Sequence, residues 1–167
     1  IGVSAATQPW ILRFDTDDIC VAGRIDIQKK FIRNNDIDFF GGQIIEFSDV
    51  NGAVLGIREV PLVNDDIVSM IYRRNAFNHV TMAIRRDVLF RHPYPNIPGF
   101  EDYALWVTLI SKNYRFANIS DVLVMVRAGH AMLIRRSGID YAKSEIIFRI
   151  HMVLLKFYNA RKVVFFG

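Results

Sequence analysis

The sequence predicts an α/β fold in which helices flank a mixed β-sheet. Short β-branched segments alternate along the chain with segments of helical periodicity, an alternation that is typical of α/β sheets. The turn Asn51-Gly52 is a strong hairpin signal, and it returns one strand antiparallel to the preceding one, which makes the sheet mixed. With 167 residues, 51% of them hydrophobic, the chain can bury the core of a single domain spanning residues 1–167.

The first half of the chain predicts short strands around one clear helix. Pro9 ends a small-residue helix, and Ile25, Gln28 and Phe31 recur at helical spacing. Gly41-Gly42 interrupts a β-branched and aromatic run, which predicts a bulge or a close backbone contact. In order, we expect the end of a helix at residues 2–7, a strand at 10–14, a loop at 15–18, a helix at 23–34, a strand at 37–47 and its hairpin partner at 54–57.

The second half of the chain adds longer helices. Three prolines between His92 and Gly99 require a loop, and Leu105, Trp106 and Leu109 follow it at the spacing of a buried helix face. A further apolar set repeats at helical spacing near the C-terminus: Ile146, Ile150, Val153, Leu154 and Phe157. In order, we expect a helix from residue 64, a strand at 79–84, a loop at 92–99, a helix at 101–112, strands at 116–119 and 122–126, and a long helix from residue 139.

Composition limits the classes of protein to which the chain can belong. No apolar run reaches the roughly 18 residues that a membrane-spanning helix needs. The single cysteine excludes an internal disulfide and suits a reducing compartment, so we expect a cytoplasmic location, with the inner face of the plasma membrane as an alternative. A net charge of +4 is mild, and we expect no nucleic-acid partner.

Asp15-Thr16-Asp17-Asp18 is the most informative segment of the sequence. It follows the apolar residues Ile11, Leu12 and Phe14, so a strand delivers three carboxylates to its carboxyl end. Carboxylates this close repel one another unless a cation or a hydroxylated ligand lies between them, which favours a metal or nucleotide site. A solvated turn with Asp18 as the helix cap is the competing interpretation, and this segment alone does not separate the two.

A second acidic pair, Glu101-Asp102, follows the proline-rich loop and opens a helix. Carboxylates at a helix start are stabilised by the helix dipole, which by itself explains the pair. A junction between a loop and a helix is also where a general base can be presented to a substrate.

Taken together, these features resemble family-2 glycosyltransferases, and most closely the bacterial exopolysaccharide and lipopolysaccharide enzymes of the amylovoran-biosynthesis type. The resemblance spans nearly the whole chain. The matching elements are Asp15-x-Asp17, Arg24 and Gln28, Gly41-Gly42, Asn78-His79 before Arg85-Arg86, Glu101-Asp102 with Trp106, Phe116-x-Asn118-Ile119 leading to Leu123 and Arg127, and Arg135-Arg136-Ser137-Gly138.

The resemblance implies a GT-A fold and inverting transfer of a sugar from a nucleotide-diphosphate donor, a UDP-sugar in the first instance, with Mg²⁺ or Mn²⁺. By the same resemblance, Asp17 would bind the metal, and Asp15 would bind the ribose or a metal-bound water. Asp102 would be the general base, and Glu101 would orient it or contact the acceptor. The acceptor would be a glycan or a lipid-linked sugar of cell-surface polysaccharide synthesis.

The resemblance assigns less specific roles to the remaining residues. Arg135 and Arg136 would clamp the diphosphate or the phosphate of a lipid-linked acceptor, although a solvated pair explains them equally well. His79 could line the acceptor pocket, but a hydrogen-bonded core histidine is the more common case. Trp106 is expected in the core, and Arg24 with Gln28 is expected to hold the acidic loop.

The sequence departs from the family pattern at its start. In the family, earlier βα units form the base and ribose pocket, and residues 1–7 match the helix that ends them. We therefore expect the C-terminal portion of a catalytic domain that lacks these first units. Such a chain would expose sheet and apolar surface, which predicts self-association.

Two other functions remain open on the sequence. An apolar strand ending in Asp-x-Asp also begins the aspartate-nucleophile phosphohydrolases, with Asp15 as nucleophile and Asp17 as acid/base, but the lysine and further acidic pair of that class have no convincing candidates. The chain could instead be a non-catalytic fragment that binds glycans or a partner through its basic C-terminal helix. That helix could also contact a membrane peripherally, although packing within the protein is the more common role.

Overall fold

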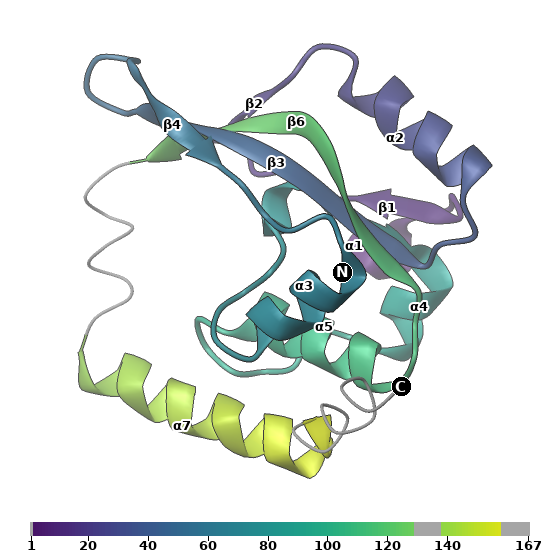
Figure 1. Ribbon diagram of the computed structural model, residues 1–167, viewed down its shortest axis with the longest axis vertical. Coiled ribbons are helices and arrows are strands. Elements are labelled where there is room, and N and C mark those ends of the chain that lie inside the picture. Colours follow the sequence, from purple (N-terminus) through teal and green to yellow (C-terminus); the bar gives the residue numbers. More distant parts are fainter. Residues whose placement is uncertain (1, 129–137, 158–167) are drawn as a thin grey trace.

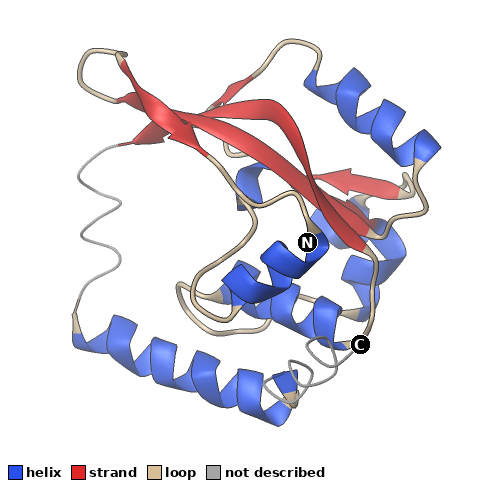
Figure 2. Cartoon of the chain, viewed as in Figure 1, coloured by secondary structure: helices blue, strands red, loops and turns tan. Residues whose placement is uncertain are grey.

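A six-stranded mixed sheet with helices on both faces forms the framework of the protein (Figures 1 and 2). The computed structural model describes residues 2–128 and 138–157. The strands are β1 (Trp10–Leu12), β2 (Ile19–Cys20), β3 (Phe39–Ser48), β4 (Val54–Arg58), β5 (Ala83–Arg85) and β6 (Phe116–Ala128). The helices are α1 (Gly2–Ala5), α2 (Arg24–Asn34), α3 (Asn64–Ile71), α4 (Arg86–Arg91), α5 (Glu101–Ser111) and α7 (Ile139–Leu154), and a 3₁₀ turn, η1, covers His79–Thr81.

Strand β3 is the centre of the sheet. The strand order is β1-β5-β3-β6-β2, with β4 also paired to β3. The β3–β6 pair is parallel, whereas the other pairs are antiparallel, so the sheet is mixed as predicted. The hairpin at Asn51-Gly52 is confirmed as the β3–β4 connection. Both Phe39 and Phe40 are completely buried although they point to opposite faces, because helices cover both sides of the sheet here.

Gly41-Gly42 lies where β3 passes closest to its neighbours. The register of the β3–β6 pair shifts between Gly41 and Gln43, which confirms the predicted irregularity. A Cβ atom on Gly42 would lie 2.9 Å from the backbone oxygen of Asp121 and 2.8 Å from Leu123 Cδ1. The close approach of these strands therefore requires glycine.

Two apolar cores occupy the two faces of the sheet. On one side, α2 covers the sheet (Figure 1). Its Phe31 packs against Phe40, and its Ile32 packs against the same core. On the other, α3, α5 and α7 enclose a larger core in which Phe39 stacks on Trp106 with ring centroids 5.5 Å apart. The prediction that Trp106 lies in the core is confirmed, because its side chain is fully buried.

Several sequence-based expectations for individual elements were wrong. Residues 79–81 form the turn η1, and the strand is confined to Ala83–Arg85. The two strands expected at 116–119 and 122–126 are one continuous strand, β6. Short elements β2 and α4 were not predicted, because two or six residues carry too little periodicity. Of the residues expected to share one face of α2, Gln28 is buried but Ile25 is 47% exposed.

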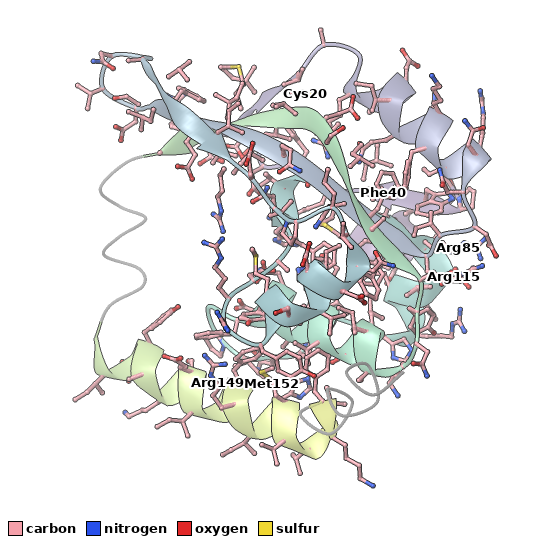
Figure 3. The ribbon with its side chains drawn as sticks, in the orientation of Figure 1. Cys20, Phe40, Arg85, Arg115, Arg149 and Met152 are labelled. Atoms are coloured by element: carbon pink, nitrogen blue, oxygen red, sulfur yellow. The ribbon has the colours of Figure 1, made fainter. Side chains whose placement is uncertain are left out.

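Helix α7 is rotated relative to the sequence-based expectation. Its buried residues are Ser144, Phe148 and Met152, and the last two belong to the larger core. Figure 3 shows Met152 on the side of α7 that faces the rest of the protein. Most of the set expected to be buried is exposed: Ile146, Ile150, Val153 and Leu154. Only Phe157 of that set is buried. No helix in residues 2–128 and 138–157 is long and apolar enough to cross a membrane.

Candidate functional site

The acidic loop, residues 15–18, begins where β1 leaves the sheet beside η1. The Arg13 backbone N–H donates to the Met82 carbonyl at 2.8 Å, so the chain stays next to the β5 side of the sheet up to the loop. The Arg13 guanidinium then forms an ion pair with Asp15. This pairing offsets part of the repulsion among the three neighbouring carboxylates.

Helix α2 holds the base of the acidic loop, as the sequence predicted. Arg24 is only 2% exposed, and its guanidinium donates to the carbonyls of Arg13 at 2.6 Å and Val80 at 3.1 Å. Its Nε donates to Gln28 Oε1, and Gln28 in turn donates to the Thr81 carbonyl at 2.9 Å. Buried, charge-assisted hydrogen bonds therefore tie the loop and η1 to one helix.

The far end of the loop is attached to β6. The Arg127 backbone N–H donates to Asp18 Oδ1 at 3.0 Å, and Arg127 Nε donates to the Asp17 carbonyl at 3.2 Å. Asp18 does not cap α2, because the N-cap residue is Gly23 and no side chain in the described part of the chain caps this helix. Burial raises the pKa of Asp18 above its ordinary value, and the neighbouring charges of Asp17 and Asp15 raise it further. The hydrogen bond from the Arg127 N–H acts in the opposite direction.

Asp17 is the carboxylate that these contacts leave accessible. Its side chain is exposed, and it forms no hydrogen bond or ion pair with the residues that the structure describes. An exposed, unpaired carboxylate is a suitable ligand for a hard divalent cation. Within the described residues, no three His, Cys, Asp or Glu side chains converge as a complete metal-ligand set. A single accessible carboxylate still fits a cation such as Mg²⁺, which protein sites often bind through one or two carboxylates together with substrate phosphates.

The second acidic pair lies in the first turn of α5. Glu101 is exposed and Asp102 is half-buried. Asn75, in the segment between α3 and η1, donates from Nδ2 to Asp102 Oδ2 at 2.8 Å. This hydrogen bond ties the start of α5 to the segment between α3 and η1.

His79 connects the two acidic features. Its ring shares a hydrogen bond of 2.9 Å with the Tyr94 hydroxyl and lies edge-on to Trp106, with centroids 6.0 Å apart. Burial lowers the pKa of His79, whereas the nearby charges of Asp102 and Asp15 act in the opposite direction. Because α2 ties η1 to the acidic loop and the His79 ring contacts Trp106 of α5, η1 lies next to the elements that carry both acidic features.

Tyr94 completes this group from the proline-rich loop. Burial raises the pKa of Tyr94 to about 12, so its hydroxyl is protonated at neutral pH. The charges of Arg13 and Asp102 also act on it. The sequence allowed His79 to be either a hydrogen-bonded core residue or part of the acceptor pocket. In the structure it is hydrogen-bonded and half-buried, and it also lies next to the candidate site.

The structure brings together some of the predicted site residues and adds others. Asp15, Asp17, Glu101 and Asp102 occupy the two segments just described, whereas Arg135 and Arg136 lie outside the described residues. Three contributors were missed by the sequence reasoning: Arg13, Asn75 and Tyr94. A positive residue just before three carboxylates was a usable signal for Arg13, but Asn75 and Tyr94 carry none because their partners are distant in sequence.

Comparison with known proteins identifies the class to which this fold belongs. Among solved structures, TarS of S. aureus in complex with UDP-GlcNAc superposes with a TM-score of 0.58 at 18% identity, over 89% of this chain and 44% of that one. A mannosyltransferase of Pyrobaculum calidifontis in complex with GDP-Man and Mn²⁺ gives a TM-score of 0.53 at 17% identity, over 81% of this chain and 38% of that one. The fold is therefore that of nucleotide-sugar glycosyltransferases, as expected from the sequence.

Sequence relatives narrow the comparison further. An uncharacterized glycosyltransferase of Haemophilus influenzae is 37% identical over 149 residues, which are 86% of this chain and 54% of the relative. The amylovoran biosynthesis glycosyltransferase AmsE of Erwinia amylovora is 34% identical, over 92% of this chain and 58% of AmsE. An Escherichia coli UDP-Gal:α-D-GlcNAc-diphosphoundecaprenol β-1,3-galactosyltransferase is 31% identical, over 97% of this chain and 58% of the enzyme. No family model matches the chain.

These relatives establish the homology of the chain. It is homologous to glycosyltransferases of the amylovoran-biosynthesis and O-antigen type, which confirms the resemblance inferred from its motifs. The chain spans somewhat more than half the length of the curated relatives just described.

Proposed function

We propose that this chain contributes the metal-binding loop and the general base of a glycosyltransferase that builds a cell-surface polysaccharide. The donor would be a nucleotide-diphosphate sugar, and the acceptor a glycan or a lipid-linked sugar. The observation that carries the proposal is the position of η1, which α2 ties to the acidic loop and whose His79 contacts Trp106 on the helix that carries Asp102. Relatives named glycosyltransferases support the same reaction class.

The donor side of the proposal rests on the acidic loop. Asp17 would bind the cation, because its carboxylate is exposed and unpaired among the described residues. Asp15 is already neutralised by Arg13, so it is better suited to accept hydrogen bonds from ribose hydroxyls or from a bound water. Mg²⁺ or Mn²⁺, when bound, supplies positive charge to the leaving diphosphate. Arg135 and Arg136 are proposed, on the sequence alone, to add charge on the phosphate side.

The acceptor side of the proposal rests on α5. Asp102 would take the proton from the acceptor hydroxyl while that oxygen bonds to the anomeric carbon. The bond from the anomeric carbon to the diphosphate breaks on the opposite side, and the nucleoside diphosphate leaves. This in-line geometry inverts the anomeric configuration. General-base catalysis of this kind is worth about 10²–10⁴ in rate, and Glu101 would contact the acceptor or orient Asp102.

The phosphohydrolase alternative would use Asp15 as its nucleophile. Arg13 pairs with only one oxygen of Asp15, so the ion pair does not decide between the two reactions. We favour sugar transfer because the sequence relatives are named glycosyltransferases. If the acceptor is lipid-linked, the protein would contact the surface of the membrane that holds this acceptor.

A donor panel tests the proposed function. The protein would be incubated with UDP-Gal, UDP-GlcNAc or GDP-Man, with Mn²⁺ or with EDTA, and a diphosphate-lipid or glycan acceptor. We expect one nucleotide sugar to be consumed with acceptor-dependent release of its nucleoside diphosphate, in Mn²⁺ only. Release of inorganic phosphate that is lost in Asp15→Asn would instead support the phosphohydrolase, and binding of glycan without any turnover would support a non-catalytic module.

A further inference from the structure

Asn75 makes two hydrogen bonds with opposite ends of its side-chain amide. Its Oδ1 accepts from the backbone N–H of Phe77 at 3.1 Å, and its Nδ2 donates to Asp102 Oδ2 at 2.8 Å. The residue lies in the segment that connects α3 to η1, far in sequence from α5. The amide therefore bridges a connecting segment and the candidate base.

Chemistry fixes the orientation of this amide. A backbone N–H can only donate, so the atom of Asn75 that faces Phe77 must be the oxygen. A carboxylate can only accept when it is ionised, so the atom that faces Asp102 must be the nitrogen. Both partners impose the same orientation, and the amide cannot flip without losing both bonds.

The segment that carries Asn75 is held rigidly. Ala76 is fully buried and Phe77 is 1% exposed, and the Ala76 carbonyl accepts from Asn118 Nδ2 at 3.0 Å. Phe77 also packs against Trp106 of α5, with ring centroids 5.7 Å apart. Asn75 thus reaches Asp102 from a rigid part of the core, which preorganises the pair.

We propose that Asn75 is the positioning residue for Asp102 in the sugar-transfer reaction. It holds Oδ2, so that Oδ1, which accepts no hydrogen bond within the described residues, is directed to the acceptor hydroxyl. Without it, a carboxylate in the first turn of α5 is free to rotate toward the N–H groups of its own helix. The inference rests on the proposed function, because it needs Asp102 to be the base.

The substitution Asn75→Asp separates positioning from a purely structural role. A carboxylate at residue 75 still accepts from the Phe77 N–H, so the connecting segment keeps its hydrogen bond. It cannot donate to Asp102, and it places a like charge beside the base. Asn75→Ala removes both hydrogen bonds, so its thermal midpoint shows how much stability is lost when the connecting segment also loses its bond.

Kinetics of these variants give the first readout, with the donor and acceptor that the panel identifies. We expect Asn75→Asp to lower kcat about 10- to 100-fold, by analogy with the loss of activity when the hydrogen-bond partner of a metal ligand is removed. The KM for the donor stays unchanged, and the acidic limb of the kcat–pH profile moves to higher pH because two carboxylates share the site. The thermal midpoint of Asn75→Asp stays nearer to wild type than that of Asn75→Ala.

An NMR titration gives a second readout that needs no substrate. The side-chain amide of Asn75 should shift through one acid transition in the wild type, and this transition should be absent in Asp102→Asn. The amide of Asn118 is the internal control, because among the described residues it donates to the carbonyls of Pro61 and Ala76, which do not ionise.

Three results would overturn the inference, and they are distinguishable. If Asp102→Asn is inactive but Asn75→Asp keeps the wild-type kcat and pH profile, Asn75 does not position the base although the proposed function stands. If Asp102→Asn transfers sugar at the wild-type rate, the base assignment fails and the role of Asn75 fails with it. An Asn75 amide that does not titrate in the wild type contradicts the hydrogen bond itself.

Discussion

Asp17 and Asp18 are adjacent in sequence, yet the fold gives their carboxylates different environments. Asp18 is turned toward β6 and accepts the Arg127 N–H, whereas the Asp17 side chain stays exposed and only its backbone carbonyl is used. The sequence could locate the acidic loop but could not make this division, because Arg127 is 109 residues away from Asp18. Sequence spacing carries no information on such a partner.

Arg24 tests how strongly a single buried side chain holds the loop. Arg24→Met keeps much of the volume but removes the donors to the Arg13 and Val80 carbonyls, which are left without this partner. We expect the free energy of unfolding to fall by about 2–4 kcal/mol. Arg33→Met is the control, because Arg33 is exposed on the same helix. Equal denaturant midpoints for the two variants would contradict the assigned role.

The lowered pKa of His79 predicts how the stability of the protein depends on pH. Its pKa is lowered in the folded state, chiefly by burial, so between the folded and unfolded pKa values the unfolded state binds more protons. Its contribution is therefore fully present above the ordinary histidine pKa of about 6.5 and is lost as the pH falls below that value. We expect thermal midpoints at pH 7.5 and 5.5 to differ less in His79→Gln than in the wild type. Identical pH dependence in both proteins would contradict this.

At the scale of elements, the close approach of β3 to β6 is the feature that the sequence predicted best. Glycine pairs inside a strand have few physical explanations, and the expected irregularity at Gly41-Gly42 is present. Helix α7 was predicted in the right place but with the wrong buried face. Nearly every side of that helix carries apolar residues, so periodicity alone could not choose between Phe148 with Met152 and the Ile146–Ile150 set.

Substitution of the glycines tests the packing of β3. Gly42→Ala would place a Cβ 2.9 Å from the Asp121 backbone oxygen, which cannot move without distorting β6. We expect a loss of about 1–3 kcal/mol in the free energy of unfolding, as for overpacked cores. Gly56→Ala on β4 is the control, since no atom of residues 2–128 and 138–157 lies within 4 Å of its Cβ position. A neutral Gly42→Ala would show that β3 and β6 are not this close.

Paired truncations in α7 test its orientation. Phe148 is completely buried and stacks against Phe100, whereas Ile150 is 53% exposed. Phe148→Ala should therefore destabilise the protein by about 3–5 kcal/mol, and Ile150→Ala should have a much smaller effect. Urea denaturation measures both, and the reverse order would support the face predicted from the sequence.

At the scale of the whole molecule, exposed apolar surface predicts self-association. It lies on α7 and on the β3–β4 hairpin, where Val54, Leu55 and Ile57 are all more than half exposed. Surface of this kind favours contacts between copies. Sedimentation velocity over a range of concentrations should show a rising weight-average sedimentation coefficient, which Ile150→Lys should reduce. A single monomer boundary at high concentration would argue against association.

The donor half of the proposed site predicts a metal-dependent binding step. Asp17→Asn should weaken Mn²⁺-dependent binding of the nucleoside diphosphate at least tenfold, because it removes the accessible anionic ligand. Asp65→Asn makes the same change of charge on the exposed start of α3 and should leave binding intact. Calorimetric titration of UDP and GDP with and without Mn²⁺ measures this, and equal affinities for both variants would exclude Asp17 as the ligand.

Sugar transfer by Asp102→Asn, measured together with donor binding, tests the central claim most directly. Asp66→Asn, another carboxylate in the first turn of a helix, is the matched control. We predict that Asp102→Asn binds nucleotide sugar and Mn²⁺ as the wild type does but transfers sugar about 10²–10⁴-fold more slowly, whereas Asp66→Asn keeps both properties. Wild-type transfer rates in Asp102→Asn would contradict the assignment of α5 as the source of the base.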